Sequence, residues 1–183
     1  MDSQIDPDDR FLQFNESGLL ENVFLAIDAT VCPVQRPTED QKNYYSVKHG
    51  KHCQKWECAV RVNDGRICWV SEAYRGPVHD AAVLRTSGLL EILGKDEQLL
   101  GDKGYVGFPQ VIAPKKGKDL TEEDLFVNKF INDKRVIVEM VFGRMKIFQC
   151  LQKPWRQSYE KQHKVFLVCA HITNKKMALS PVW

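Results

Sequence analysis

The chain has 183 residues and a formal net charge of +2, with 43% hydrophobic and 27% charged residues. That length suits one domain with a single substantial core, and the composition is ordinary for a soluble globular protein. No apolar run reaches the roughly 18 residues that a membrane span needs. No secretory signal peptide and no CxxC pair accompany the six cysteines, so we expect reduced thiols in an intracellular protein.

The charge is unevenly distributed along the chain. Residues 1–40 carry nine acidic side chains and two basic ones, whereas residues 134–176 carry ten basic side chains and two acidic ones. A basic region of this kind favours a polyanionic partner such as nucleic acid. The alternative is a solvated helix face without a partner.

Residues 1–21 are acidic and show little periodicity, and we expect a truncated lead-in to one domain over residues 22–183. The apolar run over residues 22–29 predicts a buried strand with Asp28 at its carboxyl end. Residues 30–55 are polar and predict a long loop, which in compact domains is usually functional. Four possible zinc ligands lie close together in sequence, but their spacing fits no zinc finger and we predict no zinc site: His49, His52, Cys53 and Cys58.

The middle of the chain predicts further strands and one helix. Residues 56–62 and 66–72 alternate between apolar and polar side chains around Asn63-Asp64-Gly65, which predicts an antiparallel hairpin. A helix is predicted over residues 80–93, with Asp80 as its N-cap and Gly94 just after its end. Residues 98–101 predict a strand that ends before Asp102, and residues 111–114 predict a short fifth strand.

The C-terminal third is predicted to be helical. A first helix should begin near Thr121, which is followed by acidic residues, and should break near Asn132 before a second helix over residues 132–149. The last helix is predicted over residues 158–176, with these residues towards the core: Val165, Phe166, Val168, Cys169 and Ile172. The element order predicts an α/β fold with a ribonuclease H-like mixed sheet, an antiparallel hairpin plus parallel strands, flanked by helices. Its first and fourth strands should be neighbours.

Glu139 lies in the middle of the apolar helix predicted over residues 132–149. Val138 and Met140 flank it directly, so we expect a buried carboxylate whose charge a cation or metal ion must compensate. At about 100° per residue, Arg135, Glu139 and Lys146 lie within roughly 40° of one another around the helix. The alternative is a solvated pair of Arg135 with Glu139, worth about 0.2–0.5 kcal/mol.

Four acids therefore occupy candidate site positions: Asp28, Asp80, Asp102 and Glu139. Sites in open α/β sheets lie at the carboxyl ends of strands, and carboxylates are hard ligands suited to Mg²⁺ or Mn²⁺. Two such ions about 4 Å apart can activate the attacking oxygen and stabilise the leaving oxygen in a phosphodiester displacement. Taken one by one, the aspartates also fit simple turn formers or a helix cap.

Four motifs carry a specific resemblance to a known family. LAIDAT, GPVHDAAVL, LLGDKGY and RVIVEMVFGRMK follow one another within residues 22–176. In this order and with these gaps, they resemble the DDE endonuclease domain of PIF/Harbinger-type transposases and of the nuclease-like proteins derived from them. Arg135, Glu139 and Lys146 are also similar to the signature around the third acid in related bacterial insertion-sequence transposases.

The resemblance implies a divalent-metal-dependent DNA endonuclease that hydrolyses phosphodiester bonds or transfers strands. It implies a catalytic triad of Asp28, Asp102 and Glu139. The same three acids, together with Asp80, would bind Mg²⁺ or Mn²⁺. Arg135 and Lys146 would contact DNA phosphates near the scissile bond.

The resemblance also implies partners and a location. It allows a Myb/SANT-type DNA-binding partner protein that brings the chain from the cytoplasm to the nucleus, and it is compatible with an oligomer. Ala29 stands where the family usually has glycine, next to the first catalytic acid. The alternative is therefore a domesticated, non-cleaving protein of transposase origin that binds DNA or another protein and keeps the fold as a scaffold.

Overall fold

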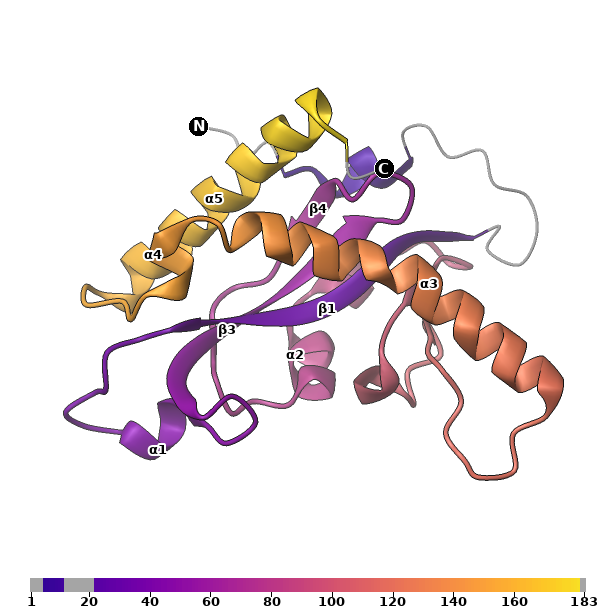
Figure 1. Ribbon diagram of the computed structural model, residues 1–183, viewed down its shortest axis with the longest axis horizontal. Helices are drawn as coiled ribbons and strands as arrows, with labels where there is room; N and C mark the ends of the chain where they lie inside the picture. The colour runs from indigo at the N-terminus through magenta and orange to yellow at the C-terminus, as the bar shows by residue number, and fades with distance from the viewer. Residues whose placement is uncertain (1–4, 12–21, 182–183) are drawn as a thin grey trace.

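The computed structural model describes residues 5–11 and 22–181, and the strands of this part form a seven-stranded mixed sheet flanked by helices (Figure 1). The strands are β1 (Val23–Pro33), β2 (Tyr45–Ser46), β3 (Lys51–Arg61), β4 (Ile67–Val70), β5 (Tyr74–Arg75), β6 (Gln98–Leu100) and β7 (Val111–Ile112). The helices are α1 (Gln41–Tyr44), α2 (Asp80–Thr86), α3 (Glu122–Met145), α4 (Gln149–Gln152) and α5 (Tyr159–Leu179), with 3-10 turns η1 (Pro7–Phe11), η2 (Leu89–Glu91) and η3 (Lys103–Tyr105). The predicted mixed α/β fold is confirmed, and it is consistent with a ribonuclease H-like fold.

The sheet combines an antiparallel part with a parallel part. Its order is β2-β3-β1-β6-β7, and β4 and β5 also pair with β3. β3 is antiparallel to β1 and β4, whereas β1, β6 and β7 run parallel to one another. The predicted hairpin around Gly65 and the predicted pairing of the first strand with the strand before Asp102 are both confirmed.

The long loop predicted over residues 30–55 is wrong. β1 continues to Pro33, β3 begins already at Lys51, and α1 and β2 lie between the two strands. The pairing of β1 with β3 extends to Pro33 opposite Cys53, so residues 30–33 and 53–55 use their backbone groups in the sheet. Two neighbouring strands that pair throughout can extend into sequence that lacks a continuous apolar run.

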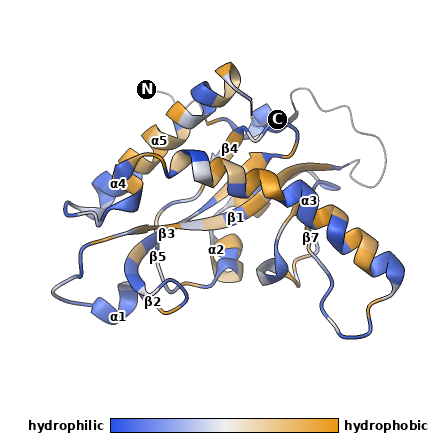
Figure 2. Cartoon of the chain, in the orientation of Figure 1, coloured by the Kyte–Doolittle hydropathy of each residue, from blue (hydrophilic) through white to orange (hydrophobic). Residues whose placement is uncertain are grey.

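Each face of the sheet has its own core. One core lies under α3, α4 and α5, where Trp56 of β3 stacks on Phe166 of α5 at a ring distance of 4.5 Å. The other core lies under α2, η2 and η3 and contains Leu84, Leu89 and Tyr105. Hydrophobic residues run along the central strands, whereas α1 is mostly hydrophilic (Figure 2). In the described part of the chain, neither α3 nor α5 nor any shorter helix is apolar enough over a sufficient length to cross a bilayer.

The helices depart from their predicted bounds in three ways. α3 is one continuous helix through Asn132, because Thr121 and Asp124 form a capping box and the apolar periodicity continues. α2 is short, its N-cap is His79 and not Asp80, and Gly88 at φ 85° follows it, so Gly94 does not end it. On α5, Phe166 and Cys169 face the core as predicted, but Val168 is 57% exposed and Ile172 is 37% exposed.

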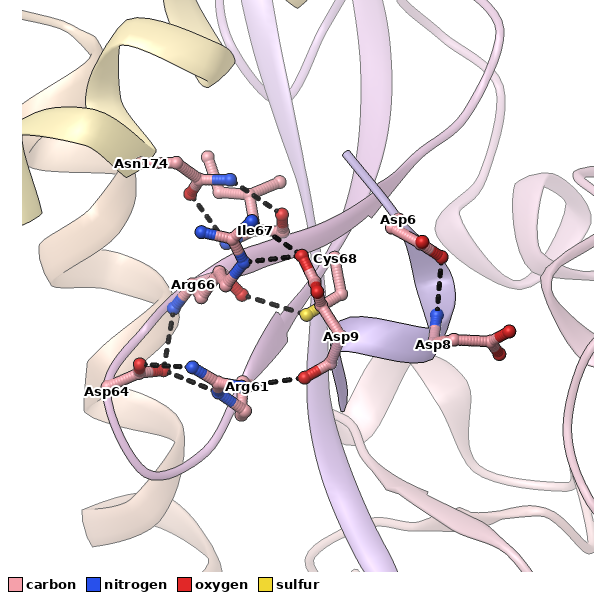
Figure 3. A network of polar contacts seen from close by, with 9 residues as sticks. All are labelled: Asp6, Asp8, Asp9, Arg61, Asp64, Arg66, Ile67, Cys68 and Asn174. Atoms are coloured by element: carbon pink, nitrogen blue, oxygen red, sulfur yellow. Dashed lines mark hydrogen bonds and ion pairs between the residues drawn. The ribbon is translucent and has the colours of Figure 1, made fainter. Parts of the chain in front are cut away.

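The described part of the predicted N-terminal segment, residues 5–11, packs against the domain. The Arg10 guanidinium is buried against the Glu97 carboxylate, with Nε 2.8 Å from Oε1. The Asp9 carboxylate accepts from Arg66, and the Asp9 carbonyl accepts from Arg61 (Figure 3). The rest of the predicted lead-in, residues 1–4 and 12–21, lies outside the described residues.

Candidate active site

The parallel register of β1 and β6 places Asp28 and Asp102 at the same level of the sheet. Ala26 of β1 is opposite Leu100 of β6, and each aspartate follows its strand's paired residue by two positions. Asp28 was predicted at the end of its strand, but β1 continues beyond it to Pro33. It lies within β1 at the point where the pairing with β6 stops, because β3 continues to pair with β1 on the other side.

The electrostatics of Asp28 show that other acids are near. Burial raises the pKa of Asp28 to about 6. The hydrogen bond from the Ala29 N–H and the charge of the Arg135 guanidinium act in the opposite direction and lower this pKa. The charges of Asp102 and Asp80 raise the pKa of Asp28 further. Carboxylates that repel one another in this way are typical of a site that attracts a cation.

Arg135 of α3 lies against Asp28. Its Nη2 donates to Asp28 Oδ2 at 3.4 Å, and the guanidinium is largely buried. The second carboxylate oxygen of Asp28 accepts from the Ala29 N–H at 2.7 Å. The predicted contact of Arg135 with a DNA phosphate stays a prediction, but this arrangement already places a guanidinium beside Asp28, the first acid of the predicted triad.

Asp80 lies at the start of α2 and pairs with lysines. Lys55 of β3 is buried, and its Nζ donates to Asp80 Oδ1 at 2.7 Å and to the Val78 carbonyl. Lys48 Nζ lies 3.7 Å from Asp80 Oδ2. Whether Asp80 binds metal stays a prediction. The structure shows a carboxylate that already has a close cationic partner. Asp102 has none among the described residues, and its Oδ1 accepts from the Gly104 N–H at 2.6 Å.

Glu139 is exposed on α3, so the expectation of a buried carboxylate is wrong. The side of α3 that faces the sheet carries Ile137, Val138 and Val141. Glu139 is exposed at the edge of this side, about one turn after the buried Arg135. Periodicity alone could not decide this, because apolar residues flank Glu139 on both sides of the sequence. Its predicted part in the triad is not tested by this position.

The donor set fits a hard divalent cation, but the described residues do not form a complete ligand cluster. Among them, no group of three or more histidine, cysteine, aspartate or glutamate side chains is arranged to hold a metal ion. Asp28 and Asp102 are brought to one level, and Asp80 is close enough to affect the pKa of Asp28. Carboxylate oxygens are the ligands that Mg²⁺ and Mn²⁺ prefer.

A group of four lysines lies near these acids, and only one of them, Lys146, was among the predicted site residues. Burial lowers the pKa of His49, and four positive charges around it lower this pKa further: Lys48, Lys55, Lys51 and Lys146. We call these four residues the lysine cluster. It joins the end of α3 to the β2–β3 region, and Lys55 connects it to Asp80. The high lysine content of residues 42–55 was the signal for it in the sequence.

Comparisons with known proteins agree with this geometry. The model of the family described as "DDE superfamily endonuclease" matches residues 27–174. A relative from Microchaete diplosiphon, the "Probable transposase for insertion sequence element IS702", is 30% identical over 164 residues, which are 85% of this chain and 58% of the relative. This chain therefore spans less than two thirds of that relative's length. No solved structure matches. The chain belongs to the DDE superfamily of endonucleases.

Proposed function

We propose that this protein is a divalent-metal-dependent DNA endonuclease of transposase type, which hydrolyses phosphodiester bonds or transfers a strand to a 3′-hydroxyl. The observation that carries the proposal is the parallel register of β1 and β6, which sets Asp28 and Asp102 at one level of the sheet. The family match supports a nuclease, and the similarity to a probable transposase supports a role in transposition.

In this proposal Asp28, Asp102 and Glu139 hold two Mg²⁺ or Mn²⁺ ions, with Asp80 as an additional ligand. When bound, the ions supply the positive charge that stabilises the phosphate in an in-line displacement. The chain's own contribution is the fixed placement of the carboxylates. Glu139 is exposed on α3, and the proposal has it complete the site from the solvent side.

The basic groups would hold the DNA. Arg135 lies directly beside Asp28. Lys146, at the C-cap of the same helix, belongs to the lysine cluster, which reaches Asp80 through Lys55. Lysine and arginine side chains bind phosphates through charge, which positions the strand without reading its sequence. We propose that the strand runs from the lysine cluster to Asp28.

Cleavage of supercoiled plasmid tests the enzyme directly. The wild-type protein should nick plasmid in the presence of Mg²⁺ or Mn²⁺, and Asp28→Asn and Glu139→Gln should abolish nicking while leaving the fold intact by circular dichroism. An exposed acid away from the site gives a matched control, since Glu160→Gln on α5 should nick like the wild type. Nicking that persists in Asp28→Asn would contradict the catalytic assignment.

A second candidate function is a domesticated scaffold that binds DNA or protein without cleaving. The observation that favours it is that Arg135 and Lys55 already neutralise Asp28 and Asp80, and that Glu139 points outward. Calorimetric titration with Mn²⁺ separates the two functions. An intact nuclease should bind Mn²⁺ with heat that Asp102→Asn abolishes, whereas a scaffold need not bind the ion at all.

The subtype and the partners are further proposals based on the sequence motifs. We propose a PIF/Harbinger-type origin and a Myb/SANT-type partner that brings the protein to the nucleus, where it acts on DNA as a monomer or an oligomer. A fluorescently tagged chain should move from cytoplasm to nucleus when such a partner is co-expressed. An unchanged distribution would contradict the partner proposal.

A further inference from the structure

Glu57 is a fully buried carboxylate that the proposed reaction does not use. It lies in the middle of β3, opposite Ala29 of β1, and has no exposed surface. Side chains of a strand alternate between faces, so Glu57 points to the α2 side of the sheet while Asp28, next to Ala29, points to the α3 side. A buried carboxylate is costly unless hydrogen bonds compensate it, so its partners indicate why it is there.

The first partner of Glu57 is Ser87. The Ser87 hydroxyl donates to Glu57 Oε2 at 3.1 Å. Ser87 is the C-cap of α2, and Asp80 is the first residue of this helix. Because α2 has only seven residues, a bond that fixes its end also restricts the position of its start. Glu57 therefore acts on Asp80 through the length of α2.

The second partner is Tyr105, the last residue of η3. Its hydroxyl and Glu57 Oε1 are both buried, and neither has a hydrogen-bond partner among the described residues. Each of the two groups affects the pKa of the other, so they lie near each other. Burial raises the pKa of Glu57 to about 7, and the Ser87 and Tyr105 hydroxyls, as donors, oppose this rise. Burial also raises the pKa of Tyr105, so its hydroxyl keeps the proton that it offers to Glu57.

Tyr105 in turn fixes the turn that carries Asp102. Asp102 is the N-cap of η3, and its carbonyl accepts from the Tyr105 N–H at 3.1 Å. The turn is tightly packed, since a Cβ added at Gly101 would lie 3.1 Å from the Tyr105 Cβ. A shift of the Tyr105 ring would therefore move the backbone that presents Asp102.

We propose that Glu57 is a positioning residue for the active site, which braces α2 through Ser87 and η3 through Tyr105 and so sets Asp80 and Asp102 relative to each other. α2 and η3 also contact each other directly, so the brace lies beneath an existing interface. The role in a reaction rests on the proposed function, but the brace is a property of the fold and is testable without any activity.

Hydrogen–deuterium exchange measured without metal tests the brace. Ser87→Ala should speed exchange in peptides over residues 80–88 by about fivefold, the effect of one lost hydrogen bond. Tyr105→Phe should speed exchange over residues 101–107, because it removes the polar group that lies near the buried Glu57 carboxylate. Thr173→Val is the matched control, because it removes a buried hydroxyl of α5, on the other face of the sheet. It should leave both peptides unchanged.

Variants of Glu57 itself sharpen this test. Glu57→Gln keeps a polar group that can bond both hydroxyls, so exchange should stay near the wild-type rate, whereas Glu57→Ala should speed exchange in both peptides. In Glu57→Ala, adding Tyr105→Phe should have no further effect, because the hydroxyl has lost its partner. Equal exchange in the wild type, Tyr105→Phe and Ser87→Ala would overturn the proposal, even if Glu57→Ala fails to fold.

Binding of Mn²⁺ tests whether the brace positions the acids. Tyr105→Phe should weaken Mn²⁺ binding several-fold in calorimetry, and Thr173→Val should not change it. If the wild type binds no Mn²⁺, the proposed function fails while the exchange data still decide on the brace. If Mn²⁺ binds equally to the wild type and to Tyr105→Phe, Glu57 has no positioning role.

Discussion

The two faces of the sheet are buried by different chemistry, although alternate residues of one strand supply both. On the α3 and α5 side, β3 contributes Trp56 and Cys58 to an apolar core. On the α2 side, the same strand contributes Lys55 and Glu57, both buried and both bonded to polar groups of the elements that cover them. The difference indicates that β3 contributes apolar packing to the first face, while on the second face it also supplies the buried polar partners of α2, which carries Asp80.

This comparison explains why charged groups are tolerated inside a small domain. Lys55 is compensated by Asp80 and a carbonyl, and Glu57 faces two hydroxyls. Removing one member of such a group leaves the other buried without compensation, which costs more than the group contributes when intact. We therefore expect the stability of the protein to depend on side-chain volume at β3 residues that face α3 and α5. At β3 residues that face α2, it should depend on side-chain charge.

The largest effect is expected on the apolar face. Trp56 is completely buried, stacks on Phe166 and donates to His163 Nδ1 at 3.0 Å. Trp56→Ala should lower the free energy of unfolding by about 3–5 kcal/mol, because it leaves a large cavity and removes the hydrogen-bond donor to His163 Nδ1. Urea denaturation measures this change. Trp155→Ala, at a half-buried tryptophan, is the matched control and should cost much less; an equal cost would contradict the assignment of the core.

The next effect concerns charge on the α2 face. Burial raises the pKa of Glu57 from 4.5 to about 7, so the folded protein keeps a proton that the unfolded chain releases between these pH values. Stability should therefore fall as pH rises through this window, by up to about 3 kcal/mol from this group. Glu57→Gln has no charge to bury and should lack this loss.

Thermal or urea unfolding of both proteins from pH 4.5 to pH 8 measures the difference. The stability of Glu57→Gln relative to the wild type should increase steadily with pH. Asp28, whose pKa burial also raises, titrates in both proteins and cancels in the comparison. If the stability difference between Glu57→Gln and the wild type does not change with pH, the pKa of Glu57 is not raised by folding.

The contrast between the faces also marks what the sequence could predict. The hairpin followed from Asn63-Asp64-Gly65, and the neighbouring positions of Asp28 and Asp102 followed from two apolar runs, since both patterns are local. Glu57 could not be found, because an acid in the alternating stretch 56–62 looks like a solvent-facing residue. It is buried only because α2 and η3, which are distant in sequence, cover that face of β3.

The same reasoning explains the errors on the helices. Glu139 was expected inside because its neighbours are apolar, yet the helix face is decided by the sheet below it, and Arg135 extends to Asp28 in its place. Val168 and Ile172 belong to a stripe one position away from the buried one that contains Phe166 and Cys169. A rotation of a helix by one residue is invisible to a pattern in which apolar residues occur on both sides.

The smallest effect is expected at the edge of the site, where charge acts in solvent and not under α2. Lys146 is half-buried at the C-cap of α3 and is a member of the lysine cluster. About two helical turns separate it from Glu139, roughly 10 Å along the axis, which is too far to pair with that carboxylate. A phosphate contact should thus be its role, and Lys146→Ala should reduce the slope of log affinity against log salt by about 1.

DNA binding measured at several salt concentrations gives the slope, and Lys164→Ala on α5 gives a matched control with an exposed lysine. Mn²⁺ affinity should be the same in Lys146→Ala and the wild type; an unchanged salt slope, or weaker Mn²⁺ binding, would show that Lys146 acts on the acids and not on the strand.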